Sequence, residues 1–157
     1  MELLTKHFGM LTVGEDDMII FEEGLPGFPE DKRFIIIFDE TAENKFYWLQ
    51  SMDDGYIALM LIDSFDVMPE YDPLIDEAEI KALGTHDVED IEDLLVFNVV
   101  IIGDSLSDCK VNLKAPIIIN NFTKRGKQII VQNEEYNISH QLEECVKNEG
   151  RVLACES

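Results

Sequence analysis

The chain has 157 residues, the length of one ordinary domain, and 46% of them are hydrophobic, with a mean hydropathy of −0.04. This apolar content excludes an intrinsically disordered chain and predicts a folded core. Thirty-three acids against twelve bases give a net charge of −21. That charge argues against direct binding of nucleic acid or anionic lipid, because both require a protein to neutralise phosphates.

No run of about 18 apolar residues occurs, so the sequence predicts no membrane-spanning helix. The N-terminal segment MELLTKHF lacks the basic-then-apolar order of a signal peptide. The cysteines Cys109, Cys145 and Cys155 lack the spacing of a disulfide framework or a zinc site. We therefore expect a cytoplasmic protein with free thiols, and we separately expect a monomer.

Most of the chain consists of short segments rich in Ile, Val, Leu and aromatic residues, with turn residues between them, as is typical of strands. The predicted strands are 2–8, 10–13, 17–21, 33–38, 45–52, 56–62, 95–102, 110–114, 116–120 and 127–132. Asp54-Gly55 lies between two apolar runs and predicts a hairpin turn of the type that needs positive φ. The segment 120–126 predicts a second, longer hairpin connection.

Two glycines, two prolines and three phenylalanines lie in the early stretch FEEGLPGFPEDKRF, which is too irregular for a helix or a ladder strand. Pro26 fixes φ while Gly24 and Gly27 permit a tight bend, so Leu25 and Phe28 can fold back over a barrel end. A rigid loop that presents apolar side chains also loses little entropy when a partner docks. The loop can therefore be interpreted as a plug at the barrel end or as a partner-binding site, and both interpretations stay open.

Two predicted strands, RFIIIF and FYWLQS, carry apolar side chains on both of their faces. An antiparallel strand that faces water would have polar residues on one face. Either these strands are covered on both faces, which we favour, or one face is a binding surface.

The best predicted helix is 74–83, in which Leu74, Ala78 and Leu83 share a side and Gly84 provides a stop. A second helical turn is expected at 87–93.

The final stretch, from Ser139 onward, predicts a short amphipathic helix with a frayed end. Ten short strands with one or two short helices favour a mainly β, small antiparallel β-barrel-like single domain. We place this domain at residues 1–142 and expect residues 143–157 to form a C-terminal tail, as a short helix or a disordered segment.

Charge is distributed unevenly along the chain. Between residues 63 and 93 twelve acids stand against one base, Lys81, whereas residues 109–133 hold five bases and no acid. The acidic segment has the charge to attract a basic partner and to raise its association rate. The alternative is that these acids only keep the protein soluble.

Motifs for catalysis do not occur in this sequence: there is no Gly-rich phosphate loop, GxSxG or HExxH, and the histidines stand in separate segments. The acid clusters DETAEN and DVEDIED lack the spacing of an EF-hand. We therefore expect a protein that is not an enzyme and has no cofactor. A metal-dependent hydrolase is the less favoured alternative.

Five motifs resemble those of the FliW-type flagellar assembly factors of bacteria, in the same order and spacing. They are EEGLPGF (22–28), FYWLQS (46–51), LLVFNVV (94–100), VNLKAPIIIN (111–120) and GKQIIVQNEEYNISH (126–140). The resemblance covers most of residues 1–142 and implies a small β-barrel-like adaptor that works by partner switching. It implies binding of flagellin before export and of CsrA, the carbon storage regulator, an RNA-binding translational repressor.

In that circuit flagellin in the cytoplasm occupies the factor, and the free repressor blocks flagellin translation until secretion releases the factor. An export chaperone for flagellin without repressor binding is the alternative. We hypothesise that the acidic segment helps to attract the repressor and repels RNA phosphate within roughly 8 Å at physiological salt. The predicted partner-binding residues are Gly24, Leu25, Pro26, Gly27, Phe28, Tyr47, Tyr71, Glu77, Glu79 and Asp90.

Overall fold

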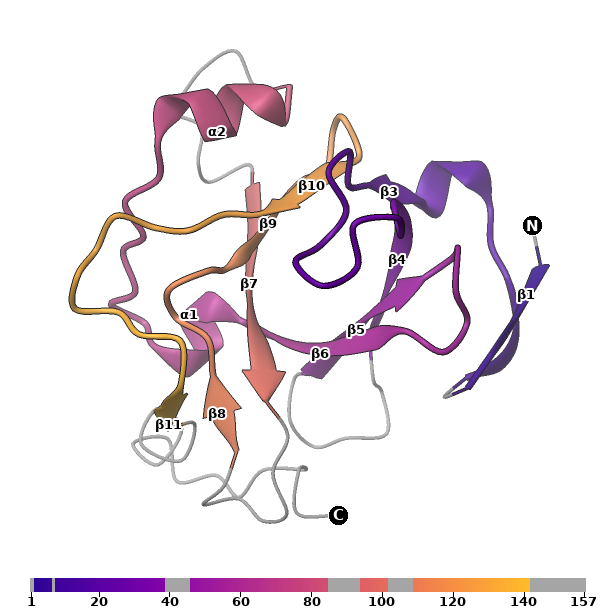
Figure 1. The fold of residues 1–157 in the computed structure, drawn as a ribbon, viewed down its shortest axis with the longest axis horizontal. Coiled ribbons are helices and arrows are strands. Elements are labelled where there is room, and N and C mark those ends of the chain that lie inside the picture. The colour runs from indigo at the N-terminus through magenta and orange to yellow at the C-terminus, as the bar shows by residue number, and fades with distance from the viewer. Residues whose placement is uncertain (1, 7, 39–45, 85–93, 102–108, 142–157) are drawn as a thin grey trace.

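The computed structural model describes residues 2–6, 8–38, 46–84, 94–101 and 109–141 (Figure 1). The elements are β1 Glu2–Thr5, β2 Gly9–Thr12, the 3-10 turn η1 Glu15–Asp17, β3 Ile19–Ile20, β4 Arg33–Phe38, β5 Phe46–Ser51, β6 Ala58–Asp63, α1 Ser64–Val67, α2 Glu77–Ala82, β7 Leu94–Ile101, β8 Lys110–Val111, β9 Ile117–Asn120, β10 Arg125–Gln128 and β11 His140–Gln141. No helix in these ranges is long and apolar enough to cross a membrane.

Seven strands form a closed barrel in the order β7-β6-β5-β4-β3-β10-β9, and β9 pairs again with β7. The neighbours along this circuit pair antiparallel, except that β3 pairs in parallel with β10 through Ile20 and Arg125. Strands β8 and β11 extend the sheet beyond the second half of β7. The predicted mainly β, barrel-like fold with one or two short helices is therefore confirmed.

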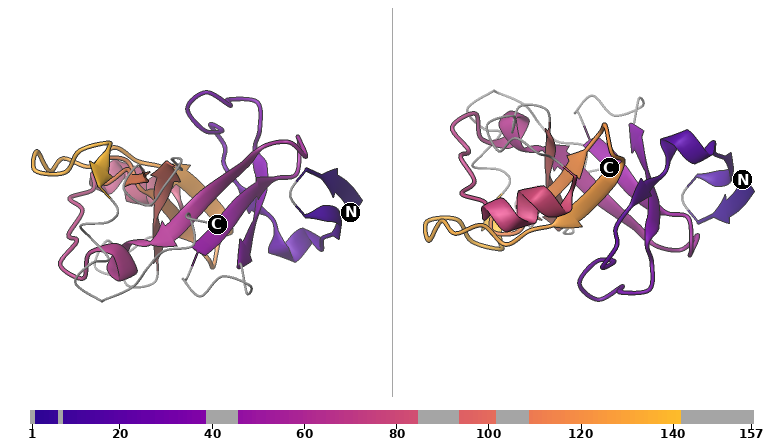
Figure 2. Two further views of the ribbon diagram at one scale, coloured as in Figure 1. Left: turned by 90° about the horizontal axis from the view of Figure 1, so that it is seen from below. Right: turned by 90° about the horizontal axis from the view of Figure 1, so that it is seen from above.

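The alternation of side chains along the strands creates a barrel interior and two covered outer faces. The interior is filled by residues such as Phe34, Leu49, Leu61, Phe97 and Ile117. One outer face, over β6, β7 and β9, packs against α2 and the segment that follows β10. The other lies under the β1–β2 hairpin, which sits on the side of the barrel away from α2 (Figures 1 and 2).

The β1–β2 hairpin covers the outer face of β4, one of the two strands that are apolar on both faces. On β4, Phe34 points into the barrel, while Ile35 packs on the outside against Val13, Met18 and Met52. The covered interpretation therefore holds for the first half of β4. Its last residue, Phe38, is 48% exposed.

The predicted hairpin at Asp54-Gly55 is confirmed, because β5 and β6 pair antiparallel around it. The expected positive φ at Gly55 is wrong: among the described glycines, only Gly9, Gly24, Gly27 and Gly84 have one. Gly55 is required instead by a tertiary contact. A Cβ there would lie 2.1 Å from the backbone oxygen of Leu4 in β1.

The predicted helix at 74–83 is confirmed in part as α2, which begins after Asp76, whose side chain accepts a hydrogen bond from Ala78 N at 3.2 Å. The expected common side of Leu74, Ala78 and Leu83 is wrong, because Leu74 precedes α2 and is exposed, whereas Leu83 is buried. It ends before Gly84, whose φ is 90°, as a left-handed stop requires. Neither α1 nor β11 was predicted from the sequence. Residues His140 and Gln141 form β11, so the expected helix does not begin at Ser139. The helical turn expected at 87–93 lies outside the described residues, and the boundary at residue 142 stays a prediction.

Candidate partner-binding surface

The loop between β3 and β4 is closed by a four-residue turn. Leu25 N donates to Phe28 O at 3.2 Å, and Phe28 N donates to Leu25 O at 2.8 Å. Pro26 and Gly27 stand at the two central positions, and Gly27 has a φ of 87°. Gly24 has a φ of 67°, and a Cβ there would lie 2.6 Å from Pro29 O. The tight bend expected from these residue types is confirmed.

The two apolar side chains of this turn have different surroundings. Leu25 is 2% exposed and packs in the barrel interior with Phe21 and Phe34. Phe28 is 36% exposed. Leu25 therefore plugs the barrel and does not present its side chain to a partner, whereas Phe28 remains accessible at the surface.

Asp53, in the β5–β6 turn, anchors the returning end of the loop. Its carboxylate accepts hydrogen bonds from Lys32 N at 2.8 Å and Arg33 N at 3.0 Å, and it pairs with Arg33 Nη2 at 2.7 Å. Burial alone would raise the pKa of Asp53, but these hydrogen bonds and the guanidinium lower it on balance. Ser51 Oγ also donates to Asp31 Oδ1 at 3.2 Å.

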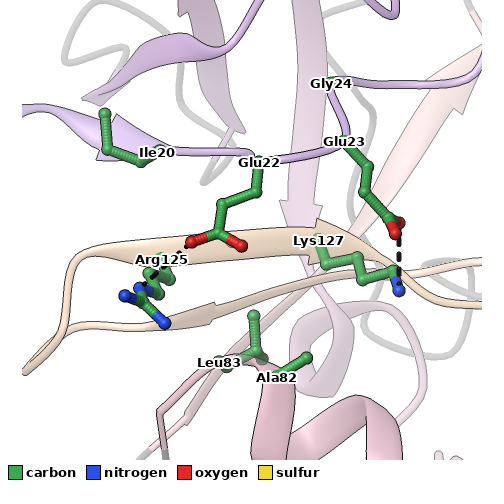
Figure 3. A pocket seen from close by; sticks show the side chains of 9 residues that line it. Ile20, Glu22, Glu23, Gly24, Ala82, Leu83, Arg125 and Lys127 are labelled. Carbon is green, nitrogen blue, oxygen red and sulfur yellow. Dashed lines mark ion pairs between the residues drawn. The ribbon is translucent and has the colours of Figure 1, made fainter.

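Lys127 on β10 anchors the leading end of the loop and links it to α2. Its Nζ lies 3.1 Å from Glu23 Oε2 in the loop and 2.9 Å from Glu79 Oε2 in the helix. The hydrogen bond to Glu79 is the main cause that raises the pKa of Lys127, against the effect of burial. Beside this pair Arg125 Nε lies 3.7 Å from Glu22 Oε1 (Figure 3).

A shallow hollow of about 60 Å³ between the loop, β10 and the end of α2 is lined by Glu22, Glu23, Arg125 and Lys127 (Figure 3). We call this region the loop–helix surface and define it by Glu22, Glu23, Gly24, Glu79, Ala82, Leu83, Arg125 and Lys127. Thr123 fixes the end of α2 beside it, because its Oγ1 donates to Leu83 O at 2.6 Å. Three acids against two bases leave the surface acidic, with exposed Glu77 in the first turn of α2 adding to the charge.

The structure brings together two sets of predicted residues that lie far apart in the sequence. Lys127 connects the Gly24–Phe28 loop with Glu79 through Glu23. Tyr71 is placed elsewhere: it is 3% exposed, and its hydroxyl donates to Leu113 O at 2.5 Å. Burial raises the pKa of Tyr71 to about 12. Tyr71 is therefore a core residue whose side chain is not available to a partner.

Tyr47 lies on another part of the barrel, in a groove of about 440 Å³ that contains none of the loop–helix residues. Its ring contacts those of Phe38 and Phe97 in a tilted geometry, with centroids 5.1 Å from each. Asp90 lies outside the described residues.

Sequence reasoning missed Lys127 and Asp53, which hold the two ends of the loop. The separation of charge along the chain was the available signal for Lys127, because a basic hairpin tends to meet acids. No pattern pointed to Asp53. Within the part of the chain that the structure describes, no three His, Cys, Asp or Glu side chains are grouped to hold a metal.

Comparison with known proteins adds independent information. The family model described as FliW protein matches residues 2–142. The flagellar assembly factor FliW of Caldanaerobacter subterraneus subsp. tengcongensis is 47% identical over 148 residues, covering 94% of this chain and 97% of the relative. FliW of Thermotoga neapolitana is 36% identical over 141 residues, covering 89% and 92%. A crystal structure of the flagellar assembly factor FliW superposes with a TM-score of 0.81 at 32% identity, covering 90% of this chain and 96% of that one.

Proposed function

The chain belongs to the FliW family of flagellar assembly factors, and we propose that it acts in the cytoplasm by partner switching. It binds flagellin before export and, when flagellin has been secreted, binds the RNA-binding repressor CsrA. Capture of the repressor frees flagellin mRNA for translation, so synthesis follows export.

The observation that carries this proposal is the pairing of a preorganised loop with an acidic helix on one surface. Asp53 and Lys127 hold the two ends of the loop, so a partner that docks there orders little additional chain. Phe28 supplies an accessible apolar contact. The exposed carboxylate of Glu77 supplies part of the charge that attracts a basic, RNA-binding protein.

Isothermal calorimetry with CsrA from the same organism, repeated after saturation with flagellin, tests the switch. Tight repressor binding that flagellin abolishes is the expected result. Binding of flagellin without any binding of the repressor would reduce the protein to an export chaperone. Binding of neither would remove the partner-switching proposal.

A charge reversal tests whether the acidic helix attracts the repressor. Glu77→Lys should weaken repressor affinity about two- to fivefold, as expected for one partly screened charge pair. Glu2→Lys is the matched control, because it changes the net charge equally on the β1–β2 hairpin, on the side of the barrel away from α2 (Figure 2). Equal loss of affinity in both variants would show that only the net charge matters.

A further inference from the structure

Among the described strands, none covers one edge of β4 beyond Phe34, because β3 is too short. Strand β3 pairs with β4 only at Arg33 and Phe34, whereas β4 continues to Phe38. Arg33 O accepts a hydrogen bond from Met52 N at 2.7 Å, so the backbone N–H and C=O of Arg33 point toward β5. Backbone groups alternate in direction along a strand. The N–H and C=O groups of Ile36 and Phe38 therefore point to the open edge, where no described strand pairs with them.

The groove that contains Tyr47 lies beside this edge. Its volume is about 440 Å³, and Ile36 and Phe97 line it together with Tyr47. Two apolar side chains are exposed in the same region: Phe38, whose ring contacts that of Tyr47, is 48% exposed, and Leu95, which lines the groove, is 40% exposed. The place thus combines backbone groups that no described strand pairs with and a hollow lined by both apolar and polar side chains, two features that an added strand can use.

The charges around the groove favour a cationic segment. Asp17 and Asp63 line it, and the single base in the lining is Lys124. Exposed Glu15 and Asp16 continue the acidic turn next to Asp17. Burial raises the pKa of Tyr47, and the carboxylates of Asp63 and Asp66 raise it further.

We propose that the open edge of β4 binds an extended segment of the repressor as an added strand, with alternate apolar side chains in the groove and a Lys or Arg beside Asp17. The inference rests on the proposed function for the identity of the partner. Among the two partners proposed, charge complementarity selects the repressor, because a protein that binds RNA must carry basic residues. The added strand would satisfy the free groups of Ile36 and Phe38.

Amide hydrogen exchange on the whole protein, measured by NMR alone and at saturation with CsrA, tests this inference. The amides of Ile36 and Phe38 should slow at least about tenfold on binding, because each gains a hydrogen bond. The amides of Ile35 and Ile37, which face β5, are the internal control and should change less. Repressor binding without slower exchange at Ile36 and Phe38 would overturn this inference and leave the proposed function intact.

Other outcomes separate the two proposals. If the repressor does not bind at all, both fail. If flagellin rather than the repressor slows these amides, the choice of occupant is overturned.

A pair of variants gives a second readout. Phe38→Pro removes the N–H at the open edge, while Phe38→Ala keeps it and removes only the exposed ring. Repressor affinity should be at least about fivefold lower in Phe38→Pro than in Phe38→Ala, because only the proline variant loses the backbone hydrogen bond. Equal affinities in two folded variants would contradict strand addition. The exchange measurement on the unmodified protein decides the matter if Phe38→Pro does not fold.

Discussion

Replacing Leu25 by alanine should test whether the β3–β4 loop is part of the barrel core. The side chain is 2% exposed and packs against Phe21 and Phe34. Truncation of a buried leucine costs about 2–5 kcal/mol, depending on how far the surroundings collapse into the cavity. Because Asp53 and Lys127 hold both ends of the loop, collapse is restricted, and we expect Leu25→Ala to cost about 3 kcal/mol.

Urea unfolding followed by the fluorescence of Trp48, the only tryptophan, measures this cost. Phe28→Ala is the matched control in the same turn, and we expect it to cost about 1 kcal/mol because that ring is already partly in water. A loss of stability in Leu25→Ala no greater than that in Phe28→Ala would refute the assignment of Leu25 to the core. Phe28→Ala should instead weaken flagellin binding.

Three further predictions concern backbone fit and charge. Gly55→Ala should destabilise the fold by about 2 kcal/mol or more in urea unfolding, since its Cβ would overlap Leu4 O; an unchanged midpoint would contradict the packing of β1 on the β5–β6 turn. Asp53→Asn should make the free energy of unfolding depend less on pH in the acid range. Because folding lowers the pKa of Asp53, its carboxylate stabilises the wild-type protein above the unfolded pKa, and this stabilisation is lost as the pH falls through the folded pKa. Parallel pH curves for the two proteins would argue against Asp53 as an anchor of the loop. Lys127→Met should lower the free energy of unfolding by about 1 kcal/mol at pH 7 and should speed amide exchange at Gly24. Because folding raises the pKa of Lys127, its stabilising effect is fully present below the unfolded lysine pKa and is lost as the pH rises through the folded pKa. The stabilities of wild type and variant should therefore converge at strongly alkaline pH.

Local chemistry in the sequence was enough to predict the features that depend on neighbouring residues. The tight turn at Pro26-Gly27 follows from the fixed φ of proline and the positive φ of glycine. The barrel follows from ten short apolar segments with turn residues between them. The stop after α2 follows from Gly84.

Features that depend on distant residues were not predictable in the same way. Gly55 is a glycine because β1 packs against it, and nothing within the turn itself reveals that contact. Tyr71 can be buried because its hydroxyl donates a hydrogen bond to Leu113 O, 42 residues away in the chain. The joining of Glu23 to Glu79 through Lys127 requires the closed barrel, which brings β10 between the loop and α2.

The parallel pairing of β3 with β10 has a consequence for the order of folding. It joins Ile20 to Arg125, 105 positions apart (125 − 20), through a single register pair, and Ile20 N donates to Lys124 O at 2.8 Å. The meander β4-β5-β6 consists of antiparallel neighbours in sequence and encloses much shorter loops. Closing a long loop costs more conformational entropy than forming local contacts. The barrel should therefore close last at the β3–β10 pairing and open there first. In native-state exchange the amide of Ile20 should therefore open at lower free energy than that of Leu49, inside the meander.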